Sequence, residues 1–201
     1  MNFSFCLTNE YLFRGLNDLA GKYYWLDKIV VFFAHYLPYI LVAFLILLLL
    51  KNFKKNKKII LGSFLTAGLG WLIVLLIRLF YYHPRPFVEN QVNLISSHSL
   101  TSSFPSAHAV FLFSISSFIY FYSREKCSGT RALARGEDET LISSPTTRHF
   151  WRRVSVWFLI FSFLIVVSRV FAGVHWPLDI LVGAILGIFI AFLANRLFIH
   201  L

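Results

Sequence analysis

Residues 29–50 form a run of 22 mostly apolar residues, about the length that an α-helix needs to cross the hydrocarbon core of a bilayer. Four further stretches of similar character follow, at 59–77, 105–122, 154–171 and 176–197. The chain has 201 residues, of which 58% are hydrophobic and only 14% are charged. A soluble domain of this size cannot bury that much apolar surface. We therefore predict an all-α fold, a polytopic membrane helical bundle of about five transmembrane helices in one membrane-embedded domain, 1–201.

The polar segments between these runs differ in character. Residues 1–27 are too polar to span a bilayer, and their apolar side chains have the spacing of an amphipathic helix in the membrane interface. These side chains are Tyr11, Leu12, Leu16 and Leu19. Residues 123–153 are polar and lack a periodic pattern, which predicts an irregular cytoplasmic connector. Within the first apolar run, Pro38 predicts a kink.

The positive charge of the chain predicts its orientation. The formal net charge is +10, but the basic residues gather in two segments beside apolar runs, which favours membrane topology over a nucleic-acid partner. Five lysines lie in 51–58, and seven lysines or arginines lie in 123–153. Under the positive-inside rule both segments face the cytoplasm. We therefore predict a multi-pass protein of the cell membrane with 82–106 and 171–176 on the outer, periplasmic or extracellular side.

Two arginines lie at the polar end of the second apolar run. Arg78 and Arg85 are seven residues apart, close to two helical turns, so both guanidinium groups could point the same way if the helix continues. Such arginines are often anchors that reach from the bilayer to the interface. Arg78, however, lies about one turn inside the apolar run, and guanidinium groups bind phosphate oxygens in pairs. For this segment alone both interpretations stay open.

A second polar cluster precedes the third apolar run. Pro105 is suited to the first turn of a helix, where its missing N–H is not needed. Ser106, Ala107 and His108 would then present a side chain and free backbone N–H groups at a helix N-terminus, which is a ready anion site. An ordinary helix cap with an interfacial histidine explains the same residues equally well.

The third cluster joins the last two apolar runs. Pro177 is again typical of a first helical turn, and it places His175 just ahead of the last run and Asp179 within its first turn. A separation of four residues lets a carboxylate reach the imidazole, fix its tautomer and leave the other ring nitrogen free as a nucleophile or base. Arg169 adds a third guanidinium. The alternative is a His–Asp pair that only satisfies itself at the start of a helix.

Together the three clusters bring mostly cationic groups to one membrane face. A single carboxylate among three arginines and two histidines suits an anionic, tetrahedral group such as a phosphate ester or diphosphate, and it does not suit a divalent cation. Zinc bound by His83, His98, His108 and His175 is conceivable, but their spacing does not match a metal motif. We therefore predict phosphoryl transfer without a metal or another cofactor.

These residues resemble the three-part signature of the type 2 phosphatidic acid phosphatase superfamily, Lys-x6-Arg-Pro, Pro-Ser-Gly-His and Ser-Arg-x5-His-x3-Asp. In this chain the parts are Arg78-x6-Arg85-Pro86, Pro105-Ser106-Ala107-His108 and Ser168-Arg169-x5-His175-x3-Asp179. Arg78 replaces the usual lysine, which keeps the charge but changes the hydrogen-bond geometry. Ala107 replaces the usual glycine, and neither change removes a catalytic group.

Within the superfamily, the short five-span layout and the segment 83–108 are similar to the bacitracin-resistance type of undecaprenyl-diphosphate phosphatase. This resemblance implies hydrolysis of the terminal phosphate of a polyprenyl diphosphate, in particular undecaprenyl diphosphate, in cell wall biogenesis and bacitracin resistance. Glycerolipid phosphates, namely phosphatidylglycerophosphate, phosphatidate or diacylglycerol pyrophosphate, are alternative substrates. A protein that transports anionic lipids without catalysis is a hypothesis of a different class. The oligomeric state is left open.

The resemblance also implies roles for the residues. His175 would attack the terminal phosphorus and form a phosphohistidine, with Asp179 orienting it. His108 would protonate the leaving oxygen and later deprotonate the attacking water. The substrate-binding set would hold the phosphoryl oxygens. Its members are Arg78, Arg85, Ser106, Ala107 and Arg169.

Overall fold

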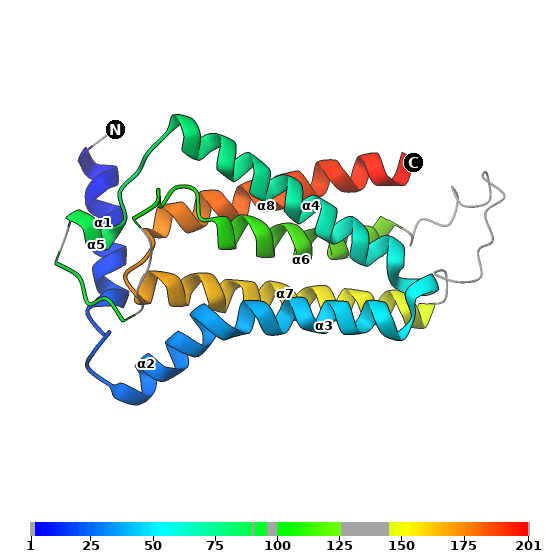
Figure 1. Ribbon diagram of the computed structural model, residues 1–201, viewed down its shortest axis with the longest axis horizontal. Coiled ribbons are helices and arrows are strands. Elements are labelled where there is room, and N and C mark those ends of the chain that lie inside the picture. Colours follow the sequence, from blue (N-terminus) through cyan, green and yellow to red (C-terminus); the bar gives the residue numbers. More distant parts are fainter. Residues whose placement is uncertain (1–2, 90, 96–99, 126–144, 201) are drawn as a thin grey trace.

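The computed structural model describes the chain except for residues 1–2, 90, 96–99, 126–144 and 201, and the described residues form helices joined by loops. Long helices lie side by side along the longest axis of the molecule, and α1 packs across one end of them (Figure 1). The elements are α1 (Phe3–Asn17), α2 (Tyr24–Val31), the π-helical turn η1 (Phe32–Tyr36), α3 (Leu37–Lys51), α4 (Phe53–Phe80), α5 (Pro86–Glu89), α6 (Ala107–Glu125), α7 (Pro145–Phe171) and α8 (Pro177–His200).

Among the described residues, four helical stretches are long and apolar enough to cross a membrane, which agrees with a membrane protein. They are Tyr24–Lys51, Asn56–Phe80, Thr147–Phe171 and Pro177–Leu197. The predicted span 105–122 corresponds to α6, which is not among these four.

The central position of α6 explains its lower hydrophobicity. This helix packs against α4, α7 and α8 at once, and Ile115, Phe118 and Ile119 are completely or almost completely buried. Serines between them are also buried, and their hydroxyl groups donate to backbone carbonyls; for example, Ser116 bonds Leu112 at 2.8 Å. A helix surrounded by other helices needs less apolar surface than one that faces lipid, because its polar groups can be satisfied inside the protein.

Two glycines of α8 let it approach α6 closely. Gly183 and Gly187 are four residues apart on one face of α8, the small-xxx-small spacing that favours tight packing of membrane helices. A Cβ atom at Gly183 would lie 2.9 Å from the backbone oxygen of Ser106, and one at Gly187 would lie 2.7 Å from that of Val110. The close packing of α8 on α6 therefore depends on the absence of a Cβ atom at these two glycines.

The predicted kink of the first span is present as η1, directly before Pro38 in the first turn of α3. Proline cannot donate a backbone hydrogen bond to the preceding turn, and a π-helical turn is a common way to absorb such a break. At this point α2 diverges from the direction of α3 (Figure 1).

Several predicted boundaries were wrong. Pro105 is not in the first turn of a helix, because α6 begins at Ala107 and the Phe104–Pro105 peptide is cis. The predicted connector 123–153 is partly helical, since α6 continues to Glu125 and α7 begins at Pro145. These helices extend past their apolar parts into residues whose charges water can solvate, so hydropathy underestimates their length. The rest of this connector, 126–144, lies outside the described residues.

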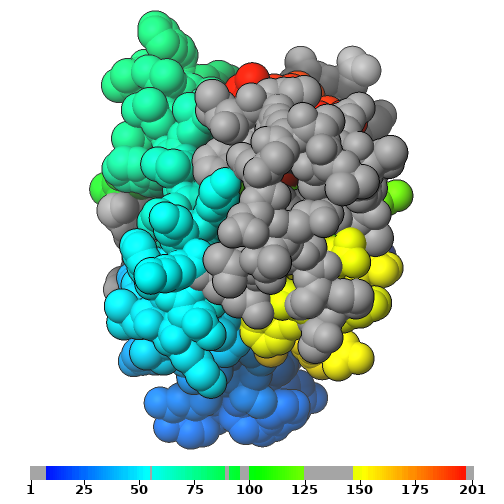
Figure 2. Space-filling view, turned by 90° about the vertical axis from the view of Figure 1, so that its right-hand side faces the viewer, coloured from blue at the N-terminus to red at the C-terminus, as the bar shows by residue number. Residues whose placement is uncertain are grey.

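The basic segments lie at the end of the bundle opposite α1. Figure 2 looks onto this end and shows the junction of α3 and α4 together with the start of α7. Lys51, Lys54 and Lys57 are exposed at the junction, and Arg152 and Arg153 are exposed on α7. Charge from two distant parts of the sequence is therefore concentrated at one end of the molecule.

Candidate active site

The three predicted clusters meet at the end of the bundle near α1. They lie at the C-terminal ends of α4 and α7 and at the N-terminal ends of α6 and α8, which all point to the same end (Figure 1). A direct backbone bond joins two of them, because the N–H of Ser106 donates to the carbonyl oxygen of Asp179 at 3.0 Å. Segments that are about seventy residues apart in sequence thus form one continuous polar site.

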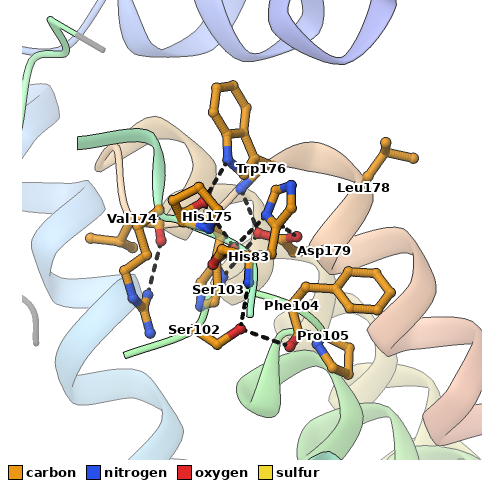
Figure 3. Close-up of polar contacts among 12 residues, drawn as sticks. His83, Ser102, Ser103, Phe104, Pro105, Val174, His175, Trp176, Leu178 and Asp179 are labelled. Atoms are coloured by element: carbon orange, nitrogen blue, oxygen red, sulfur yellow. Dashed lines mark hydrogen bonds and ion pairs between the residues drawn. The ribbon is translucent and has the colours of Figure 1, made fainter. Parts of the chain in front are cut away.

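His175 and Asp179 form a buried pair. The Nδ1 atom of His175 lies 3.5 Å from Oδ2 of Asp179, and both side chains are almost completely buried. The backbone N–H of Trp176 donates to the same Oδ2 atom at 3.0 Å (Figure 3). Pro177 is the first residue of α8, as predicted, and the four-residue spacing brings the carboxylate to the imidazole. The carboxylate therefore faces Nδ1 of the imidazole rather than Nε2.

The start of α6 supplies the neutral polar groups of the site. Ser106 is fully buried, and its hydroxyl makes no hydrogen bond within the described part of the chain. Ala107 and His108 follow in the first turn of α6 and are both partly exposed. A helix N-terminus with a spare buried hydroxyl is able to bind an oxyanion.

Arg78 connects α4 to the segment before α6. It lies two residues before the end of α4, and its Nη2 donates to the carbonyl oxygen of Pro105 at 2.8 Å. The helix does not continue to Arg85, because α4 ends at Phe80. The two arginines therefore do not lie on one continuous helix, although both side chains reach the same site.

Arg85 is a buried brace between two loops. Its side chain is 2% exposed, and it donates from Nε to the carbonyl oxygen of Thr101 at 2.9 Å and from Nη1 to that of Val174 at 2.9 Å. Burial and, to a smaller extent, the nearby charge of Arg78 lower the pKa of its guanidinium to about 10, whereas the charge of Asp179 opposes the change. Arg85 therefore keeps its positive charge at neutral pH.

Arg169 is held from the opposite side of the site. The side chain is buried at the end of α7, and its Nη1 donates to the carbonyl oxygen of Ala34 at 3.2 Å. Ala34 lies in the π-helical turn η1, where the altered hydrogen-bond pattern allows a carbonyl to accept from a side chain. The kink of the first span thus provides a hydrogen-bond acceptor for Arg169, one of the predicted phosphate-binding arginines.

The sequence suggested His83 only as a possible zinc ligand, but the structure places it in the site. Its Nδ1 lies 2.8 Å from Oγ of Ser103 and 3.8 Å from Oδ1 of Asp179. Nothing local in the sequence predicts this contact, because Asp179 is about a hundred residues away. One clue to its place in the site was present in the sequence, since His83 lies two residues before the predicted site residue Arg85. Among the described residues, which do not include His98, no group of three or more His, Cys, Asp or Glu side chains is placed to hold a metal ion.

Helix α1 covers the loop that carries His175. The ring of Phe13 packs on that of Trp176 with centroids 5.1 Å apart, and Oδ1 of Asn9 accepts the backbone N–H of Leu178 at 3.1 Å. Phe13 is buried, whereas Tyr11 on the other face of α1 is 79% exposed. The predicted N-terminal helix is present, but Tyr11 and Leu12 of its expected apolar face are exposed and Phe13 on another face packs against the site; its place in the membrane interface stays a prediction.

A buried asparagine connects α1 to two more loops. Asn17 is 0% exposed, and its amide nitrogen donates to the carbonyl oxygens of Asn93 at 3.0 Å and Phe171 at 2.9 Å. Its Oδ1 accepts the backbone N–H of Asn93 at 3.0 Å. Gly173 has a φ of +79°, and a Cβ atom there would lie 3.2 Å from the Asn17 amide. The chain thus turns tightly around this one side chain just before His175.

The comparison with known proteins places this fold and site in one class. The PAP2 superfamily, which is the type 2 phosphatidic acid phosphatase superfamily, matches residues 58–200, and the chain belongs to this family. The match contains all three predicted clusters and leaves α1, α2 and α3 outside. The protein is therefore a membrane phosphatase of the PAP2 type, and this membership implies lipid phosphates as substrates.

Two relatives share most of their length with this chain. The Bacillus subtilis (strain 168) protein named "Undecaprenyl-diphosphatase BcrC" is 28% identical over 188 residues, which cover 94% of this chain and 83% of that protein. A Bacillus licheniformis protein named "Bacitracin transport permease protein BcrC" is 28% identical over 203 residues, which cover 98% of this chain and 86% of that protein.

Two solved structures have a similar fold. Aquifex aeolicus LpxE matches with a TM-score of 0.64 and 28% identity, and the match covers 94% of this chain and 95% of that chain. The transmembrane PAP2 type phosphatidylglycerolphosphate phosphatase from Bacillus subtilis matches with a TM-score of 0.68 and 18% identity, covering 98% and 87%. The second likeness concerns the fold alone.

Proposed function

We propose that this protein removes the terminal phosphate of undecaprenyl diphosphate, leaving undecaprenyl phosphate, without a metal and through a phosphohistidine on His175. The observation that carries this proposal is the buried His175–Asp179 pair facing the start of α6, with arginines from α4, α7 and the loop after α4 around it. The choice of a polyprenyl diphosphate rests on the Bacillus subtilis relative and on its printed name.

The first half of the reaction transfers the phosphoryl group to the protein. Nε2 of His175 attacks the terminal phosphorus as the bond from that phosphorus to the bridging oxygen breaks. His108 gives a proton to the leaving oxygen, which departs as undecaprenyl phosphate. Asp179 holds Nδ1–H and stabilises the positive charge that develops on the ring.

The second half releases inorganic phosphate. His108, now neutral, takes a proton from water as that water attacks the phosphorus on His175. The N–P bond breaks and restores the neutral imidazole. Throughout both steps, oxyanion charge is stabilised by guanidinium, hydroxyl and backbone N–H groups. These come from Arg78, Arg85, Arg169, Ser106, Ala107 and His108.

The membrane arrangement follows from the same proposal. We infer that α6 crosses the bilayer with the four apolar stretches, so that one domain over 1–201 has five spans. The basic end in Figure 2 then faces the cytoplasm, and the site faces the outer surface. The lipid tail lies in the bilayer beside the helices, and its phosphates reach the interface where the arginines are.

The name of the Bacillus licheniformis relative raises transport as a different function. A transporter that only binds anionic lipids would have no use for a histidine held by a buried carboxylate, whereas a phosphatase requires one. Glycerolipid phosphates remain the closest alternative substrates, because guanidinium groups recognise the phosphate in either class of lipid.

Phosphate release from a panel of lipid phosphates tests the proposal directly. The purified protein is given undecaprenyl diphosphate, phosphatidylglycerophosphate, phosphatidate and diacylglycerol pyrophosphate, each with EDTA present, beside His175→Ala. We expect the highest kcat/KM on undecaprenyl diphosphate, no effect of EDTA and no release by the variant. A preference for a glycerolipid overturns the substrate, loss of activity in EDTA overturns the metal-free reaction, and an active variant overturns the nucleophile.

A further inference from the structure

His83 contacts the catalytic carboxylate from the side opposite His175. Oδ2 of Asp179 faces His175 Nδ1 at 3.5 Å, and Oδ1 faces His83 Nδ1 at 3.8 Å (Figure 3). Asp179 is buried, and besides the two rings its carboxylate accepts the backbone N–H of Trp176 at 3.0 Å and interacts with the charges of Arg78 and Arg85. One carboxylate therefore lies between two imidazoles, each presenting the same ring nitrogen.

The loop that carries His83 is fixed at both backbone atoms of this residue. The carbonyl oxygen of His83 accepts the backbone N–H of Ser103 at 2.8 Å, and its N–H donates to Oγ of Ser102 at 3.1 Å. The ring stacks near Tyr81, with centroids 6.3 Å apart, and meets Phe104 edge-on at 6.4 Å. Such constraints hold a side chain in one place before any substrate binds.

The contacts of Ser103 define which nitrogen of His83 carries the proton. The Ser103 hydroxyl has one hydrogen, and it is within donating distance of the carbonyl oxygens of His83, at 3.1 Å, and Pro84, at 3.2 Å. With that hydrogen used on a carbonyl, Oγ can only accept from His83 Nδ1 at 2.8 Å. His83 therefore donates Nδ1–H to Ser103, and Oδ1 of Asp179 lies near the same N–H, 3.8 Å from Nδ1 and so beyond hydrogen-bond distance.

We propose that His83 is a positioning residue that attracts Oδ1 of the Asp179 carboxylate through the positive end of its Nδ1–H bond, so that the carboxylate in turn fixes the ring of His175. This inference rests on the proposed function of His175 as nucleophile. Oδ2 faces His175, whereas Oδ1, which makes no hydrogen bond within the described part of the chain, faces His83. Groups that orient a catalytic histidine from behind in this way commonly contribute about 10- to 100-fold at metal sites.

Two amide substitutions distinguish the role of Nδ1 from that of Nε2 in the His83 ring. In His83→Asn the amide nitrogen occupies the place of Nδ1, whereas in His83→Gln it reaches the place of Nε2. We expect His83→Asn to keep kcat within about threefold of the wild-type value and His83→Gln to lower it about tenfold or more, with little change in KM for either. His149 is exposed on α7 at the other end of the molecule, and His149→Gln is the control that we expect to leave kcat unchanged.

Activity of His83→Gln with loss in His83→Asn would show that His83 acts through Nε2 on the substrate, and it would overturn the proposal. Equal activity of both variants with the wild type, or equal loss in both, would overturn it as well. The proposed function is judged separately, by the wild-type protein on the lipid panel. If the wild type prefers another lipid phosphate, the same comparison is made with that lipid.

A measurement without turnover covers the cases in which a variant does not fold or the wild type is inactive. The ¹⁵N shifts of the imidazoles, recorded on the wild-type protein in detergent, report the tautomer of each ring. We expect Nδ1–H for both His83 and His175. A neutral His83 protonated at Nε2 would overturn the proposal whatever the activity, because the ring nitrogen beside Oδ1 of Asp179 would then carry no hydrogen.

Discussion

Gly183→Ala adds one methyl group at the contact between α6 and α8. The new Cβ would lie 2.9 Å from Cβ of Ala109 and 2.9 Å from the backbone oxygen of Ser106. Carbon atoms are in comfortable contact from about 3.5 Å, so the helices must separate there by about 0.6 Å. Overpacking of this kind costs about 1–3 kcal/mol, which exceeds the roughly 1 kcal/mol that alanine gains over glycine in a helix.

The separation also acts on catalysis, because Ser106 donates its backbone N–H to Asp179 at 3.0 Å. Lengthening that bond by about 0.6 Å breaks it. Since a displacement of about 1 Å in an active site can cost about 100-fold in rate, we expect phosphate release to fall by roughly tenfold or more. The melting temperature in detergent should fall in parallel.

Gly68→Ala is the matched control for this prediction. Gly68 is an exposed glycine within α4, and a Cβ atom there would meet nothing within 4 Å. We expect this variant to keep the wild-type rate and to melt at or slightly above the wild-type temperature, because alanine favours a helix over glycine by roughly 1 kcal/mol. If Gly183→Ala behaves like Gly68→Ala in both assays, the close approach of α8 to Ser106 does not position the site, and the reasoning is refuted.

Three further predictions concern the supports of the site. Asn17→Ala should lower the free energy of unfolding by about 1–3 kcal/mol for each buried group that it leaves without a hydrogen bond. Thermal denaturation measures this loss, with Asp18→Ala at the exposed neighbouring position as the control; equal melting temperatures of the two variants would contradict the prediction. Arg85→Lys should lower kcat/KM by at least about tenfold because an ammonium cannot make both backbone bonds, whereas Arg78→Lys restores the residue of the family signature and should stay within a fewfold of wild type; equal losses would contradict this difference. In intact cells without Cys6 and Cys127, a cysteine at position 95 should react with an impermeant reagent and one at position 57 should not; the reverse pattern would contradict the orientation.

The local parts of the site could be predicted from the sequence. His175, Pro177 and Asp179 lie within five residues at the start of α8, so the short separation along the chain keeps the carboxylate near the ring. The long apolar runs likewise predicted the membrane helices, because hydropathy over about twenty residues reflects a simple physical requirement. Where a feature depends on neighbours in sequence, the pattern was sufficient.

The features that depend on distant contacts could not be predicted. The contact of His83 with Asp179 and the packing of Phe13 on Trp176 join segments far apart in the chain, and no periodic pattern records them. Whether the helix continues from Arg78 to Arg85 was left open by the sequence, and the structure ends α4 at Phe80. Burial of α6 also lowers the apolar signal on which prediction of a span depends.

The central claim is that His175 carries the phosphoryl group between the two halves of the reaction. Undecaprenyl diphosphate labelled with ³²P at its terminal phosphate is mixed with the purified protein, and the reaction is quenched with alkali within one turnover. A phosphohistidine survives alkali and is lost in acid, so we predict label on the peptide that contains His175, stable in base, released by acid and absent from His175→Ala. Labelled inorganic phosphate formed at the wild-type rate with no label on this peptide at any time would contradict the account.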